Sequence, residues 1–150
     1  MVRLLDINVL LALAWPVHLH HDAAHAWLST CEHEGWATCP LTEAGFVRIS
    51  SQPSVTKRVV AISEGLALLA RMSNRKEHRF WPQTAPVTGL LPELISPAMG
   101  PQQLSDAILL DLAIRNDGAL ATFDKRIEYL LKPGSAHRDR LEVIPIAPLL

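Results

Sequence analysis

Four acidic residues of this chain stand where a folded protein has little structural use for a negative charge: Asp6, Glu43, Asp106 and Asp124. Asp6 and Asp124 follow short apolar segments typical of buried strands. Glu43 and Asp106 fall inside segments with helical periodicity, on the side that also carries apolar residues. Burying an unpaired carboxylate costs roughly several kcal/mol, so each acid needs a cation, a hydrogen-bond donor or access to solvent.

The helix predicted over residues 102–116 shows the anomaly most clearly. At about 100° per residue, Asp106 projects from its apolar side. The other members of that side are Leu109, Leu110 and Ala113. Asp111 projects from the opposite side, with Ile108 and Arg115. Asp106 therefore interrupts a face that should turn toward the core.

The helix predicted over residues 41–51 repeats the pattern, because Glu43 projects beside Phe46 and Val47. Each acid also has an ordinary structural interpretation as a helix-terminal residue. Asp6 and Asp124 would cap the helices that follow them, Glu43 would be the acid of a capping box, and Asp106 would lie in a first helical turn.

The elements that position these acids alternate along the chain. Strands are predicted over 2–5, 36–39, 119–122 and 142–146, with a further strand at 80–81. Helices are predicted over 8–15, 21–33, 41–51, 55–72 and 102–116, with a helical turn at 92–96 inside a proline-rich loop over 82–101 and another opening at Asp124. Strands separated by helices predict an α/β fold with a central, mainly parallel sheet flanked by helices.

A parallel sheet would bring the four acids together, because the carboxyl ends of its strands line one edge. Two carboxylates about 4 Å apart repel by roughly 4 kcal/mol at an effective dielectric constant near 20. Such a cluster therefore requires divalent cations, and hard oxygen ligands favour Mg²⁺ or Mn²⁺.

Composition restricts the class of protein without identifying a ligand. The 150 residues are 49% hydrophobic and 19% charged, enough for one compact domain with a full core. A net charge of −1 gives no global attraction to nucleic acid. The apolar run over residues 9–15 is too short for a membrane span, and Asp6 does not suit a signal peptide. We expect a mature cytoplasmic protein with no membrane partner.

Four segments carry a resemblance to a known family: LLDINVLLALA, LTEAGFVRI, SDAILLDLAI and ATFDKRI. Together they resemble the PIN-domain ribonucleases, and most closely the VapC toxins of bacterial toxin–antitoxin pairs. The resemblance covers essentially residues 1–150. It implies a single PIN domain with an α/β/α sandwich fold, and a Mg²⁺- or Mn²⁺-dependent endoribonuclease that inhibits translation or growth until an antitoxin binds it.

The resemblance also assigns roles by position. It makes Asp6, Glu43, Asp106 and Asp124 the catalytic acids. Asp6, Asp106 and Asp124 would hold the metal, and the role of Glu43 stays open between a water-mediated metal contact and orientation of the nucleophile. Asn8 is the polar residue beside the first acid, and Thr122 is the hydroxyl that orients the site. RNA, an antitoxin and a second copy of the chain are the implied partners.

Local positive charge is available for RNA in two places. Lys125 and Arg126 adjoin the fourth acid, and a second basic stretch includes Arg75 and Lys76, with Arg71 and Arg79 around them. A solvated helix end accounts equally for the second stretch, because exposed Lys and Arg are ordinary.

Other interpretations compete with the nuclease. A haloacid-dehalogenase-like phosphatase would use Asp6 as nucleophile, but the position that should carry its second acid holds Asn8. A non-catalytic RNA-binding module would use the same fold without turnover. His21 and His25 have the i, i+4 spacing of a zinc pair, without a glutamate base. Cys31 and Cys39 are expected to be reduced packing residues.

Overall fold

One sheet of five parallel strands forms the centre of the molecule in the computed structural model, which describes residues 1–96 and 99–146. Its strand order is β3-β2-β1-β4-β5. The strands are β1 (Arg3–Leu5), β2 (Trp36–Thr38), β3 (His78–Phe80), β4 (Ala119–Thr122) and β5 (Leu141–Val143). All four neighbouring pairs are parallel, which confirms the predicted parallel α/β sheet.

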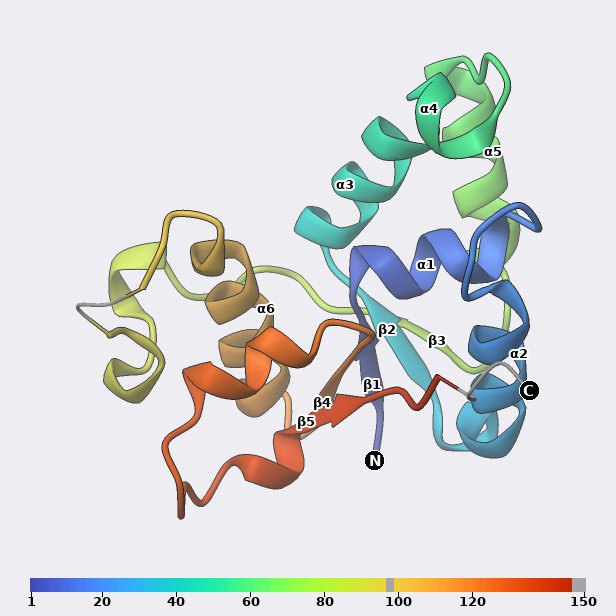
Figure 1. The fold of residues 1–150 in the computed structure, drawn as a ribbon. Helices are drawn as coiled ribbons and strands as arrows, with labels where there is room; N and C mark the ends of the chain where they lie inside the picture. The colour runs from blue at the N-terminus through green and yellow to red at the C-terminus, as the bar shows by residue number, and fades with distance from the viewer. Residues whose placement is uncertain (97–98, 147–150) are drawn as a thin grey trace.

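Helices cover both faces of this sheet (Figure 1). The helices are α1 (Ile7–Ala14), α2 (His21–Cys31), α3 (Pro40–Ser50), α4 (Pro53–Thr56), α5 (Ile62–Ser73) and α6 (Gln103–Arg115). Helix α6 lies on one face, whereas α1, α2, α3 and α5 gather on the other, with α4 at the far end of an arm formed by α3 and α5 (Figure 1). Short 3₁₀ turns occupy Glu32–Glu34, Val87–Gly89, Pro92–Leu94, Lys125–Leu130 and Arg138–Arg140.

The two faces bury separate apolar clusters because side chains alternate along a strand. In β1, Leu4 belongs to the cluster under α6 and Leu5 to the cluster under α1. In β4, Leu120 and Ala121 divide in the same way. The carboxyl ends of β1 and β4 lie side by side, because the two strands are parallel and Leu5 pairs with Ala121.

Several element boundaries differ from expectation, among them the strand predicted at 80–81, which is β3 over His78–Phe80. The helix predicted over residues 55–72 is divided into α4 and α5, because Lys57 adopts a left-handed conformation with φ 64° that ends α4. The last strand ends at Val143 rather than at residue 146. The loop predicted over 82–101 contains residues 97–98, which lie outside the described residues.

The predicted position of Asp111, on the side of α6 opposite the apolar face, does not make it exposed. Its side chain is fully buried. Its Oδ1 accepts a hydrogen bond from the Leu91 backbone N–H at 2.9 Å, and its Oδ2 accepts one from Arg115 Nε at 2.6 Å. Arg115 also donates to the Gly89 carbonyl at 2.7 Å. Asp111 thus fastens the proline-rich loop to α6.

Two further observations concern cysteines and membranes. Cys31 and Cys39 are free and buried, as expected for packing residues. None of the helices within residues 1–96 and 99–146 has the length and hydropathy that a membrane span requires.

Candidate active site

Asp6 stands at the carboxyl end of β1, where the chain turns into α1. Its Oδ1 accepts from the Ile7 backbone N–H at 2.7 Å, so the carboxylate caps α1. Its backbone N–H donates to the Ala121 carbonyl at 3.0 Å and joins this turn to β4. The side chain is only 8% exposed. Asp6 is therefore both a helix cap and a buried charge at the edge of the sheet.

Thr122, the last residue of β4, orients Asp6 from the neighbouring strand. Its hydroxyl donates to Asp6 Oδ2 at 2.7 Å and accepts from the Asp124 backbone N–H at 3.0 Å. Asn8 Nδ2 lies 3.2 Å from the same hydroxyl oxygen and 3.3 Å from Asp6 Oδ2. The side-chain Oδ1 of Asn8 accepts from the Phe123 backbone N–H at 3.3 Å. Both residues predicted beside the first acid thus contact it directly.

Asp106, in the first turn of α6, lies within electrostatic range of Asp6 and Asp124. Burial, with the charges of Asp6 and Asp124 adding to it and Arg126 opposing them, raises the pKa of Asp106 to about 6. Burial also raises the pKa of Asp6, against the hydrogen bonds from Thr122 and Ile7, with Asp124 adding to the rise. Three carboxyl groups from β1, α6 and the end of β4 therefore share one repulsive field.

The negative charge of Asp124 is partly neutralised by an ion pair with Arg126. The guanidinium donates to both carboxylate oxygens, with Nε 3.0 Å from Oδ1 and Nη2 2.8 Å from Oδ2. These bonds lower the pKa of Asp124. The Asp124 side chain also accepts from the Arg126 backbone N–H at 2.9 Å, as the cap of the turn over Lys125–Leu130.

The donor set has the chemistry of a site for a hard divalent cation. Asp6, Asp106 and Asp124 offer carboxylate oxygens, the ligands that Mg²⁺ and Mn²⁺ prefer. A cation would also relieve the mutual repulsion that raises the pKa of Asp106. As the side chains stand, no three His, Cys, Asp or Glu residues of the described ranges form a ready chelating group. Arg126 instead pairs with both oxygens of Asp124.

Glu43 is separated from this group of three. It lies in the first turn of α3, and its Oε1 accepts from the Thr38 hydroxyl at 2.7 Å. Neither Asp6 nor Asp106 owes its pKa shift to Glu43. The capping-box interpretation of Glu43 is wrong, since Thr42 bonds the backbone N–H of the cap residue Cys39. Sequence analysis missed Thr38 as the partner of Glu43.

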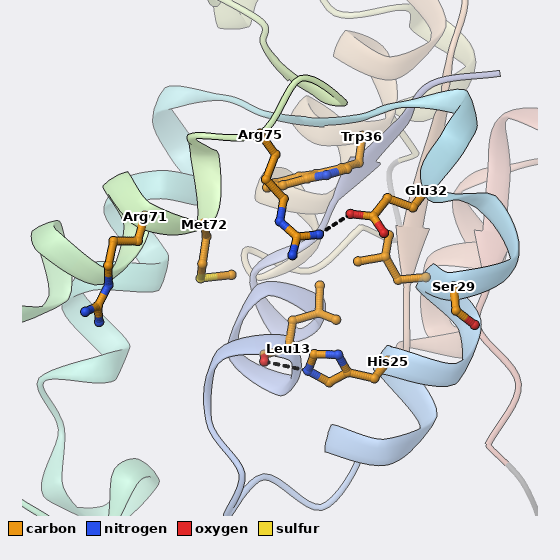
Figure 2. A pocket seen from close by; sticks show the side chains of 9 residues that line it. Leu13, His25, Ser29, Glu32, Trp36, Arg71, Met72 and Arg75 are labelled. Carbon is orange, nitrogen blue, oxygen red and sulfur yellow. Dashed lines mark hydrogen bonds and ion pairs between the residues drawn. The ribbon is translucent and has the colours of Figure 1, made fainter.

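The basic residues divide between the two ends of the sheet. Lys125 and Arg126 directly follow Asp124 and adjoin the acids. Arg75 and Lys76 precede β3, so they lie at the amino ends of the parallel strands, away from the carboxyl ends. Arg75 is paired with Glu32 (Figure 2). Lys125 and Arg126 are the basic residues that the fold brings to the acids.

The pocket shown in Figure 2 is not the acid site. It encloses about 470 Å³ between α1, α2, β2 and the end of α5, and its lining includes His25, Trp36 and Arg75 but none of the four acids. His25 Nε2 lies 2.9 Å from the Leu13 carbonyl oxygen, and His21 Nδ1 lies 2.7 Å from that of Ala12. The i, i+4 pair thus contacts carbonyl groups at the end of α1, which explains its spacing without zinc.

Asp106→Asn is expected to raise the thermal midpoint of the metal-free protein at pH 8 by a few degrees, because it removes a charge that is unfavourably buried and repelled by Asp6 and Asp124. For a chain of this size the gain is about 2–4 °C per kcal/mol. A carboxyl group whose pKa rises on folding favours the native state fully below its unfolded pKa, and this contribution is lost as the pH increases through about 6. The gain should vanish near pH 4. Thermal unfolding in chelator from pH 4 to pH 8 measures it, and a gain that does not depend on pH would contradict the assigned cause.

The chain has close relatives among known proteins. No family model matches the chain. The chain is 42% identical to ribonuclease VapC39 of Mycobacterium tuberculosis over 124 residues, which cover 83% of this chain and 89% of VapC39. It is 38% identical to ribonuclease VapC44 of the same species over 135 residues (90% and 94%), and 35% identical to ribonuclease VapC29 over 148 residues (97% and 98%).

A solved structure shares the fold at low sequence identity. It is VapBC2 from Rickettsia felis bound to a DNA fragment from its promoter, with a TM-score of 0.61 and 14% identity. The match covers 87% of this chain and 93% of the solved one. It supports the PIN-type α/β/α arrangement.

Proposed function

Because the chain belongs to the VapC ribonuclease family, we propose that it is an endoribonuclease that hydrolyses RNA with Mg²⁺ or Mn²⁺ held by Asp6, Asp106 and Asp124. The observation that carries this proposal is the placement of three acids at one edge of the sheet, where burial first, and then the charges of Asp6 and Asp124, raise the pKa of Asp106 to about 6. Groups that repel one another at the end of a parallel sheet are suited to a cation and to a phosphate that approaches it.

When bound, the cation would lower the pKa of water to supply a nucleophile and would neutralise charge on the scissile phosphate. The chain's own residues prepare this site. Thr122 and Asn8 hold Asp6 in a fixed orientation, so its carboxylate need not reorganise. Arg126 and the exposed Lys125, which adjoin the acids, would bind an RNA phosphate.

The experiment is cleavage of total cellular RNA by the purified chain, free of any antitoxin, with Mg²⁺, with Mn²⁺ and with chelator. Cleavage is expected with either metal, to cease with chelator, and to return when metal is restored. Cleavage that persists in chelator would contradict the metal-dependent centre. Binding of RNA without cleavage under all conditions would favour the non-catalytic RNA-binding module.

The phosphatase alternative has less support in the geometry. A haloacid-dehalogenase-like enzyme would need an acid at position 8, two residues after Asp6. Asn8 instead places its Nδ2 beside Asp6 and Thr122 and accepts from Phe123. An amide there positions its neighbours and supplies no general acid.

For partners, we propose a cognate antitoxin that holds the chain inactive in a cytoplasmic toxin–antitoxin pair, so that the free chain inhibits translation or growth. We also propose a homodimer. Large apolar side chains remain exposed on α5 and in the loop before it, with Ile62 54%, Leu66 53% and Val59 81% exposed. A second copy that covered them would remove this surface from water. The molar mass in solution, measured by light scattering, tests the dimer.

A further inference from the structure

A chain of three side chains ends on Glu43 and is not explained by the three-carboxylate centre. Thr38 Oγ1 donates to Glu43 Oε1 at 2.7 Å and lies 2.8 Å from His78 Nε2. Thr38 is the last residue of β2 and is fully buried. Within residues 1–96 and 99–146, this hydroxyl is the hydrogen-bond partner of the Glu43 carboxylate, and Oε2 has none.

The strand register builds this chain. His78 pairs with Trp36 in the β2–β3 ladder, and side chains at alternate positions of a strand share a face, so Trp36, Thr38 and His78 lie together. The rings of Trp36 and His78 meet edge to face, with centroids 4.7 Å apart. The His78 imidazole is therefore held between the Trp36 indole and the Thr38 hydroxyl. These two contacts fix the orientation of the ring.

The direction of the hydrogen bonds follows from proton counting. An ionised carboxylate can only accept, and a hydroxyl has one proton to donate. Since Thr38 gives that proton to Glu43, the contact with His78 requires the imidazole to donate through Nε2–H. The neutral ring must therefore be the Nε2–H tautomer, and the donors run from His78 through Thr38 to Glu43.

We propose that Thr38 and His78 are positioning residues that fix the Glu43 carboxylate for RNA cleavage, an inference that rests on the proposed ribonuclease function. Glu43 follows β2, and β2 is the direct neighbour of β1, which Asp6 directly follows. Holding Oε1 through Thr38 leaves Oε2 for water or substrate at that edge. A glutamate on a free rotamer would spend much of its time misplaced, and misplacement by about 1 Å can cost roughly 10²-fold in rate.

Paired substitutions test the chain of hydrogen bonds. Thr38→Val keeps the shape and removes the hydroxyl, whereas Thr38→Ser keeps the hydroxyl. His78→Leu removes the donor, whereas His78→Gln retains an N–H near the position of Nε2. At saturating metal, Thr38→Val and His78→Leu are expected to lower kcat about 10- to 100-fold, with the Ser and Gln variants within about threefold of wild type.

A double-mutant cycle separates positioning from a general effect on the fold. In a Glu43→Ala background, Thr38→Val should change kcat less than twofold, because the carboxylate that Thr38 positions is absent. An undiminished loss in that background would overturn the proposal. Thr56→Val is the matched control, since Thr56 is also a buried hydroxyl, donates to the Arg58 carbonyl at 2.9 Å, and lies outside the site.

A measurement independent of activity completes the test. ¹⁵N NMR of the imidazole should show the Nε2–H tautomer for His78 in the wild type and in Thr38→Ser, with a loss of this preference in Thr38→Val. A wild-type Nδ1–H tautomer would overturn the proposal even if RNA is cleaved. If the wild type cleaves no RNA, the proposed function and the catalytic role fail together, while the NMR result still decides whether the hydrogen-bonded chain exists.

Discussion

An Asp6→Asn variant is expected to cleave RNA about 10³-fold more slowly than the wild type, a loss of roughly 4 kcal/mol of transition-state stabilisation. Asp6 joins the other carboxyl groups in one field and is oriented by the Thr122 hydroxyl. The amide removes the negative charge that a cation requires. Initial rates of cleavage at matched protein and Mg²⁺ concentrations measure the loss.

The fold should survive this substitution. Asparagine has the same shape, and its Oδ1 can still accept from the Ile7 N–H at the start of α1. The substitution loses the hydrogen bond that the Thr122 hydroxyl donates to the carboxylate. This loss of stability is offset because a neutral amide is buried at a lower cost than the charged carboxylate, whose burial raises the pKa of Asp6. Asp22→Asn, at an exposed acid of α2, is the matched control. Equal cleavage by the wild type and Asp6→Asn would place the activity elsewhere.

Asp111→Ala is expected to lower the free energy of unfolding by about 3 kcal/mol, because breaking a buried, hydrogen-bonded ion pair is far more costly than removing a surface charge. The substitution removes the acceptor of the Leu91 N–H and the partner of Arg115. For a chain of this size, the thermal midpoint should fall by about 6–12 °C. Thermal and denaturant unfolding measure the change.

The control is Asp139→Ala, which also removes an aspartate beside an arginine. Asp139 is 66% exposed and lies 3.6 Å from Arg140, so its loss should cost less than about 1 kcal/mol. Below the melting transition, Asp111→Ala should cleave RNA at a rate near that of the wild type. A loss of stability no larger than that of Asp139→Ala would contradict the anchoring role of Asp111.

Asp111 also shows where helical projection is insufficient. The method assumes one buried stripe, but every residue of α6 from Leu109 to Ala113 is buried. The proline-rich loop covers the side that should face solvent, with Leu90 and Leu94 in the same cluster as α6. The i, i+4 spacing of Asp111 and Arg115 was a usable signal of pairing. The loop that covers them was not predictable from local sequence.

The acids at strand ends were predictable because topology alone places them. A chain that alternates strands and helices forms a parallel sheet, and residues after its strands must meet at one edge. Capping does not exclude the proposed role in the acid site, since Asp6 and Asp124 cap the elements that follow and still act on the carboxyl group of Asp106. The two interpretations of these acids do not exclude each other.

Features that depend on strand register could not be predicted. The contact between Thr38 and His78 joins residues 40 positions apart and requires the exact pairing of β2 with β3. In the same way, the basic character of Arg75 and Lys76 is plain in the sequence, but only their position before β3 shows that they lie at the opposite end from the acids.

The chemistry of the product ends tests the central claim most directly. Hydrolysis by metal-activated water should leave a 5′-phosphate and a 3′-hydroxyl at each cut, and it does not need the 2′-hydroxyl next to the scissile bond. RNA cut by the wild type with Mg²⁺ should therefore be degraded by a 5′-phosphate-dependent exonuclease, and the cuts should be absent with Asp6→Asn. Products with 5′-hydroxyl and cyclic 2′,3′-phosphate ends would contradict the three-carboxylate metal centre.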